Sequence, residues 1–99
     1  MSPIKSDEAV HDLSAYRASI NELDRQLIEI LGERFEICLK VADYKKENDI
    51  PMMQPDRIQM VKQRCIGIGE KFGVDAHFID RLYSLIIDEA CRLEDKAMH

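Results

Sequence analysis

The chain has 99 residues, of which 45% are hydrophobic and 33% charged, and its formal net charge is -5 at pH 7. This length suits one domain with one core, and the acidic charge excludes general nucleic-acid binding, which needs a basic face. The first residues lack the apolar run of a signal peptide, and no stretch approaches the roughly 20 apolar residues that span a bilayer. We therefore expect a cytoplasmic protein.

A long helix is predicted first. Apolar residues recur from Leu13 at alternating steps of three and four, which is the spacing of a heptad seam, at positions 13, 16, 20, 23, 27, 30, 37, 41 and 44. Asp12 or Ser14 is expected to cap its start, and Asn48 with Pro51 to end it. About 35 residues at 1.5 Å each form a rod about 50 Å long, so this helix needs a partner.

Two shorter helices follow. Pro55 suits the first turn of the second helix, Gly67 and Gly69 weaken its last turns, and Gly73 stops it. Asp75 is expected to cap the third helix. The predicted buried stripe of that helix comprises Phe78, Ile79, Leu82, Tyr83, Ile86, Ala90 and Leu93.

The resulting fold class is all-α, because the apolar runs lack the period-two alternation of strands. We expect residues 1–11 to be a flexible N-terminal segment and residues 12–99 to form a single helical domain. No metal site is predicted, since the three cysteines and three histidines do not have ligand spacing. A glycine-rich phosphate loop and a nucleophile–base pair are also missing.

Two cations occupy the apolar side of the long helix. Arg34 falls in the heptad series of Leu13, Ile20, Leu27 and Val41, where burial of a guanidinium is costly. It could simply snorkel and fix the helix register. Lys45 follows it by almost three turns on the same side, about 16 Å along the axis. Two cations facing one groove indicate an anionic ligand between them.

Three more charged residues are candidates for the same site. Arg17 lies about 42 Å from Lys45 along the helix, so the two would meet only if a second copy packed antiparallel. Arg57 opens the second helix, and for both arginines the alternative is an ordinary surface residue. Glu94 continues the line of Ala90 on the third helix, where it either marks the helix end or is the one acid among the cations. Asp88 and Arg92 are expected to form a surface pair.

These residues resemble the all-helical chorismate mutase family over about residues 12 to 96. The spacing of Arg17, Asp24, Arg34, Lys45 and Arg57 carries the resemblance, together with the run Asp-Ala-His-Phe-Ile-Asp-Arg-Leu-Tyr-Ser-Leu-Ile-Ile-Asp-Glu. Within that family, Pro-Met-Met-Gln-Pro-Asp-Arg, Val-Lys-Gln-Arg and Cys-Arg-Leu-Glu-Asp are similar to the branch that acts on 4-amino-4-deoxychorismate in routes to p-aminophenylalanine-derived antibiotics.

The resemblance implies an intertwined homodimer of three-helix chains, no cofactor, and a Claisen rearrangement of an enolpyruvyl ether to a prephenate-type product. It implies that Arg34 and the Arg17 of the other chain grip the substrate carboxylates, and that Lys45 donates to the ether oxygen. By the same resemblance Arg57 closes the site and Glu94 donates a second hydrogen bond to that oxygen. It further places Gln54, Ile58 and Ala90 among the substrate-binding positions.

A glutamate donates only when protonated. We therefore hypothesise that the pKa of Glu94 is raised and that activity falls as the pH rises through it. The positive charge of nearby Lys45 acts in the opposite direction.

Ile58 departs from the family pattern, because chorismate mutases usually have a glutamate there that accepts a hydrogen bond from the 4-hydroxyl. An unsatisfied buried hydroxyl costs about 1 to 3 kcal/mol, so efficient use of chorismate is not expected. Loop carbonyls or the amide of Gln54 could receive an amine instead. The alternatives are a chorismate mutase, an isochorismate pyruvate lyase, which also has an apolar residue at this position, and a non-catalytic helical dimerisation module.

Overall fold

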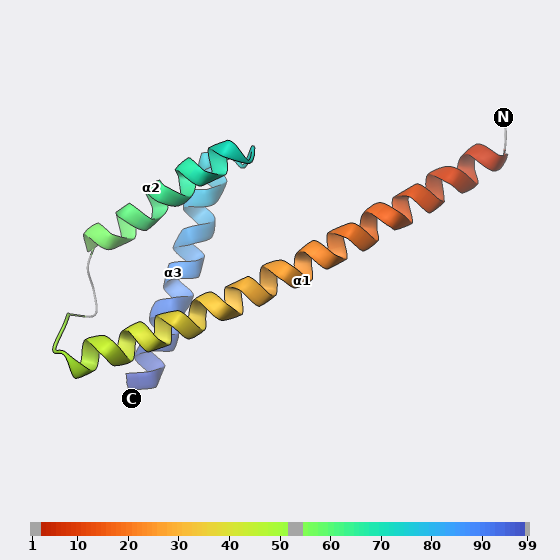
Figure 1. Ribbon diagram of the computed structural model, residues 1–99. Helices are drawn as coiled ribbons and strands as arrows, with labels where there is room; N and C mark the ends of the chain where they lie inside the picture. The colour runs from red at the N-terminus through yellow and green to blue at the C-terminus, as the bar shows by residue number, and fades with distance from the viewer. Residues whose placement is uncertain (1–2, 52–54, 99) are drawn as a thin grey trace. The chain divides into compact units, whose positions relative to one another are not determined.

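The structure, a computed structural model, describes residues 3–51 and 55–98 (Figure 1). It contains α1 (Pro3–Glu47), α2 (Pro55–Lys71) and α3 (Ala76–Met98), and no strand occurs in the described ranges. The predicted all-α class and the long first helix are confirmed. The chain divides into two compact units, residues 1–34 and residues 35–99, and each is described by itself.

The start of α1 differs from the prediction. The helix begins at Pro3, and Asp12 and Ser14 lie inside it, so neither caps its start. Proline is well tolerated in the first helical turn, and the next residues include neither glycine nor proline, so each can add one hydrogen bond to a helix that is already nucleated. The flexibility of residues 1–11 stays a prediction.

The C-terminus of α1 confirms the predicted end. The backbone N–H and the side-chain amide of Asn48 both donate to the carbonyl of Tyr44, at 3.1 and 2.8 Å. Asp49 takes a left-handed conformation with φ of 54°, and the N–H of Ile50 donates to the carbonyl of Lys45 at 2.9 Å. These bonds satisfy carbonyls that the last turn of a helix otherwise leaves without donors.

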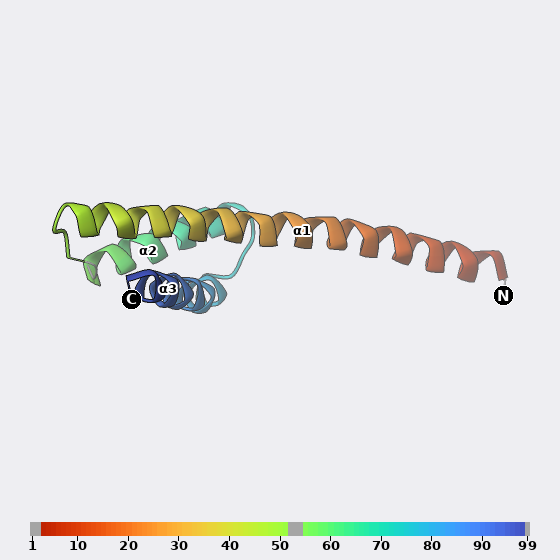
Figure 2. The ribbon, with the colours of Figure 1, turned by 90° about the horizontal axis from the view of Figure 1, so that it is seen from below.

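The hairpin between α2 and α3 also forms as predicted (Figure 2). Gly73 has a φ of 73°, a conformation that favours glycine, and the N–H of Val74 donates to the carbonyl of Gly69 at 2.9 Å. Asp75 caps α3, because its Oδ2 accepts a hydrogen bond of 2.9 Å from the N–H of Phe78.

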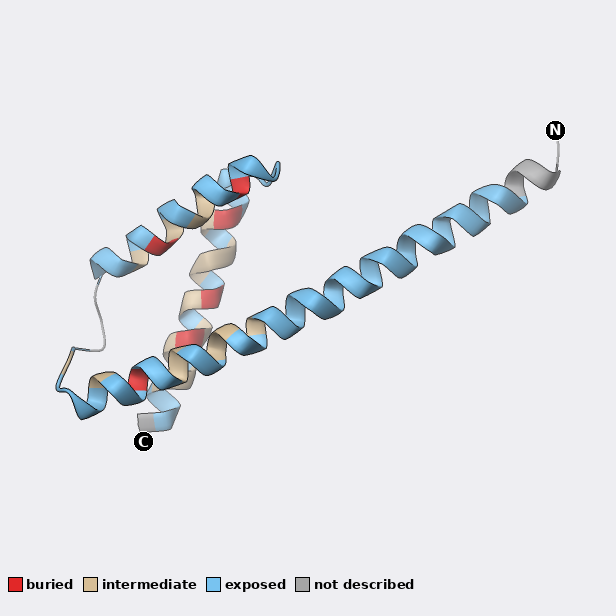
Figure 3. Ribbon diagram, in the orientation of Figure 1, coloured by how far each residue is buried: buried red, intermediate tan, exposed pale blue. Residues whose placement is uncertain are grey.

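The core of the second unit lies between its helices. Val61 and Gly69 of α2 are buried, as are Ala42 of α1 and three residues of the predicted stripe on α3, namely Ile79, Ile86 and Ala90 (Figure 3). Leu82, Tyr83 and Leu93 are half-buried. The prediction was wrong for Phe78, which is 46% exposed, because it lies in the first turn of α3 beside the hairpin.

Close packing explains Gly69. A Cβ atom at this position would run into Cδ1 of Ile79 and would lie 3.4 Å from the carbonyl oxygen of Val74. At Gly67, two residues earlier, an added Cβ would meet no heavy atom within 4 Å. Gly69 therefore lets α2 approach α3, whereas Gly67 packs against no other element in the part of the chain that the structure describes.

The first unit is a helical segment with exposed side chains on every face between residues 7 and 30 (Figure 3). Its heptad seam includes Tyr16, Ile20 and Leu23, which are 70%, 55% and 62% exposed. Such a row of exposed apolar residues marks an interaction surface.

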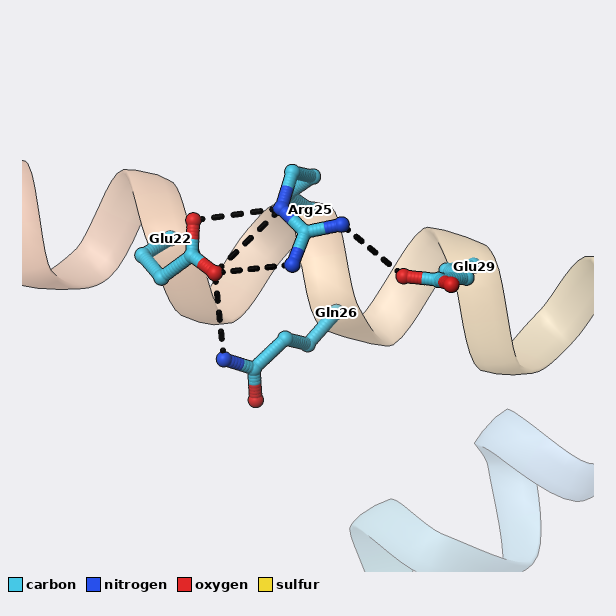
Figure 4. A network of polar contacts seen from close by, with 4 residues as sticks. All are labelled: Glu22, Arg25, Gln26 and Glu29. Carbon is cyan, nitrogen blue, oxygen red and sulfur yellow. Dashed lines mark hydrogen bonds and ion pairs between the residues drawn. The ribbon is translucent and has the colours of Figure 1, made fainter.

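A polar network lies along the same part of α1 (Figure 4). The guanidinium of Arg25 contacts Glu22 at 2.8 Å and Glu29 at 2.9 Å, and the amide of Gln26 donates to Glu22 at 3.3 Å. Hydrogen bonds from Arg25 and then from Gln26 lower the pKa of Glu22. Pairs at these helical spacings support an exposed helix modestly. None of the helices in the described ranges is long and apolar enough to cross a membrane.

Candidate active site

The candidate residues fall on both units. Arg17 and Arg34 belong to the first unit, and both lie on α1. The second unit holds the other described candidates, which are Lys45, Arg57, Ile58, Ala90 and Glu94. Gln54 lies outside the described residues.

Lys45 and Glu94 share the surroundings of one thiol. Cys91 is half-buried on α3, and burial is the largest cause that raises its pKa. The negative charge of Glu94 raises this pKa further, whereas the positive charge of Lys45, on α1, lowers it. Both charges therefore lie within electrostatic reach of Cys91, which is a position the sequence did not single out.

Three of the charged candidates are half-buried, namely Lys45, Glu94 and Arg34. A half-buried charge is partly withdrawn from water, so it acts more strongly on a bound ion than a fully exposed one does. In the second unit, an ammonium group of α1 and a carboxyl group of α3 thus lie near the same thiol.

The N-terminus of α2 supplies a different chemistry. Arg57 is exposed in the first turn of the helix, where it can reach an anion, and Ile58 beside it is half-buried. The isoleucine has no hydrogen-bond acceptor on its side chain. The helix therefore presents a cation and an apolar group at adjacent positions.

Ala90 is 6% exposed and belongs to the core of the second unit. Its methyl group is covered within the chain, so the structure places it among the packing residues. Its expected contact with substrate stays a prediction.

The predicted pair of Asp88 and Arg92 is wrong. Arg92 instead binds Glu89 in two hydrogen bonds, from Nε at 2.7 Å and from Nη2 at 2.8 Å. A spacing of three residues brings the fork of the guanidinium onto the carboxylate, and this contact lowers the pKa of Glu89.

Sequence comparison identifies the class of protein. The profile of the family described as Chorismate mutase type II matches residues 16–95, so the chain belongs to this family. It is a mutase, an isomerase whose reaction is a pericyclic rearrangement. The prediction of an enzyme is confirmed, and a dimerisation module without activity is no longer needed to explain the chain.

Individual relatives narrow the comparison. The chain is 39% identical over 88 residues to the 4-amino-4-deoxychorismate mutase of Streptomyces pristinaespiralis. The aligned residues cover 89% of this chain and 68% of the relative. It is 36% identical over 88 residues to the enzyme of the same name from Streptomyces venezuelae, covering 89% of this chain and 85% of the relative. The bifunctional chorismate mutase/prephenate dehydratase of Escherichia coli (strain K12) is 36% identical over 78 residues, which are 79% of this chain and 20% of that protein.

Proposed function

We propose that the protein catalyses the Claisen rearrangement of 4-amino-4-deoxychorismate to 4-amino-4-deoxyprephenate. The observation that carries this proposal is the match to two 4-amino-4-deoxychorismate mutases over 89% of the chain. Ile58 argues against chorismate as the substrate, because its side chain offers no acceptor to the 4-hydroxyl group, but it offers none to a 4-ammonium group either.

The reaction needs positioning and charge stabilisation. One carbon–oxygen bond breaks while one carbon–carbon bond forms, so the enzyme requires no nucleophile. In our proposal Lys45 donates a hydrogen bond to the ether oxygen as negative charge develops on it, and a protonated Glu94 donates a second. Arg34 binds a substrate carboxylate through its guanidinium fork, and Arg57 closes the site from α2. Holding the substrate in its reactive conformation supplies the remaining acceleration.

A second copy of the chain completes this site in our proposal. The exposed seam of α1, from Leu13 to Ile30, would be covered by the same helix of another protomer. Of its residues, Leu27 is 54% exposed and Ile30 is 59% exposed. An antiparallel arrangement would bring the Arg17 of one chain to the Arg34 and Lys45 of the other, and two-fold symmetry would create two such sites.

Mixing two inactive variants tests this shared site. Arg17→Ala and Lys45→Ala are purified separately, unfolded together and refolded. A mixed dimer would have one site with both changes and one site with neither, so the mixture regains about a quarter of the wild-type activity. The matched control is Arg34→Ala with Lys45→Ala. Both of these changes affect the same half of the site, so every site keeps one defect and activity stays at the level of the single variants. Equal activity of the two mixtures contradicts the shared site.

Product analysis tests the substrate. The purified protein is incubated separately with 4-amino-4-deoxychorismate, chorismate and isochorismate, and the products are identified by mass spectrometry. We expect the amino compound to be turned over with the highest kcat/KM. Preferential turnover of chorismate contradicts the proposal, and release of pyruvate from isochorismate would favour a lyase. Ile58→Glu, which restores an acceptor, is expected to raise kcat/KM for chorismate.

A further inference from the structure

A cluster of three polar side chains joins α2 to α3 in the second unit. The Nζ of Lys62 donates a hydrogen bond of 2.7 Å to Oγ of Ser84 and lies 3.4 Å from Oδ1 of Asp80. The Ser84 hydroxyl donates in turn to the backbone carbonyl of Asp80 at 3.1 Å. The side chain of Lys62 is 14% exposed and that of Asp80 is 48% exposed. The cluster therefore contains a largely buried ammonium whose charge is balanced by one carboxylate.

This ammonium lies one helical turn from a residue of the proposed site. Lys62 follows Ile58 by four residues, so the two side chains share a face of α2, with Cβ atoms about 6 Å apart. On α3, Ser84 precedes Ala90 by six residues, which is about 9 Å along the axis. The cluster is thus a neighbour of Ile58 on α2, whereas on α3 Ser84 and Ala90 lie on different faces of the helix.

A cationic substituent near Ile58 would be repelled by an unbalanced charge on Lys62. Two positive charges about 10 Å apart near a protein surface interact strongly enough to change binding by roughly tenfold at an effective dielectric constant of about 20. The hydroxyl of Ser84 satisfies a hydrogen bond of the ammonium but contributes no negative charge. Asp80 alone among the three side chains of the cluster can cancel the charge.

We propose that Asp80 is a specificity-determining residue, which neutralises Lys62 beside Ile58 and so lets the site accept a substrate with a cationic group at its fourth carbon. This inference rests on the proposed function. An ammonium group on the substrate can then be accepted beside Ile58 without a direct acceptor, because Asp80 balances the charge of Lys62 on the neighbouring turn of α2. A neutral hydroxyl at the same carbon would be nearly insensitive to this balance.

Four variants and two substrates test the proposal. Asp80→Asn, Lys62→Met, the double variant and the control Glu70→Gln are assayed with 4-amino-4-deoxychorismate and with chorismate. The measured quantity is the ratio of the two kcat/KM values. Asp80→Asn is expected to lower the ratio of amino to hydroxyl substrate about three- to tenfold, since partial exposure of Asp80 screens its charge. The double variant removes both charges and restores the ratio.

The control loses one carboxylate near the hairpin end of α2 and is expected to keep the wild-type ratio. A purely structural role of the cluster would lower both kcat/KM values together, along with the melting temperature, and leave the ratio unchanged. That result overturns the proposal, as does an equal change of the ratio in Glu70→Gln.

The same experiment separates this inference from the proposed function. Preference of the wild-type protein for chorismate contradicts the proposed function. In that case the dissociation constants of the two compounds provide the readout, measured by calorimetry on proteins that also carry the inactivating change Lys45→Ala, so that neither compound is turned over. A ratio of constants that shifts on Asp80→Asn supports the charge balance, and an unchanged ratio overturns it.

Discussion

Replacement of Gly69 by alanine is expected to loosen the contact between α2 and α3. The added methyl group would collide with Cδ1 of Ile79, a side chain that is only 5% exposed, and would lie 3.4 Å from both its Cγ1 atom and the carbonyl oxygen of Val74. Overpacking of this kind costs about 1–3 kcal/mol. Alanine regains about 1 kcal/mol in a helix interior relative to glycine, so the net loss is up to about 2 kcal/mol.

Gly67→Ala is the matched control, because it makes the same chemical change in the same helix, where the new Cβ would meet no described atom of another element within 4 Å. We expect it to raise the free energy of unfolding by about 0.5–1 kcal/mol. Urea denaturation followed by far-ultraviolet circular dichroism, at one protein concentration, measures both variants. If Gly69→Ala is as stable as Gly67→Ala, the close approach of α2 to α3 is refuted.

Three further predictions concern the cap, the carboxyl group and the thiol. Asp75→Ala is expected to lower the free energy of unfolding by about 1 kcal/mol, because the N–H of Phe78 loses its acceptor; Asp75→Asn, which keeps a capping oxygen, should lose much less. Glu94→Gln should remove the expected fall in activity as the pH rises. An unchanged fall in the pH–rate profile would show that another group titrates. Cys91 should react with iodoacetamide more slowly at pH 8 than a free thiol peptide, since its raised pKa keeps it protonated. Equal reaction rates would contradict this prediction. Because its folded pKa is raised, the protonated thiol of Cys91 stabilises the folded protein below the pKa of the unfolded thiol, and this contribution is lost as the pH rises through the higher folded pKa.

The sequence by itself determined the secondary structure where short-range chemistry decides it. Pro55, Gly73 and Asp75 mark helix ends through a fixed φ, a left-handed turn and a capping oxygen, and all three act within a few residues. The spacing of Arg34 and Lys45, read with the motifs around them, also indicated the family. These features need no knowledge of what packs against them.

The tertiary structure decided which residues of equal local character differ in role. Gly67 and Gly69 are equivalent in helix propensity, yet only Gly69 faces Ile79. Phe78 and Ile79 are both apolar, yet only Ile79 is buried. Lys62 is one of several lysines in the chain, and its contacts with Asp80 and Ser84 join residues 18 and 22 positions apart. Such contacts depend on how two helices are placed against each other, which the periodicity of either helix alone does not contain.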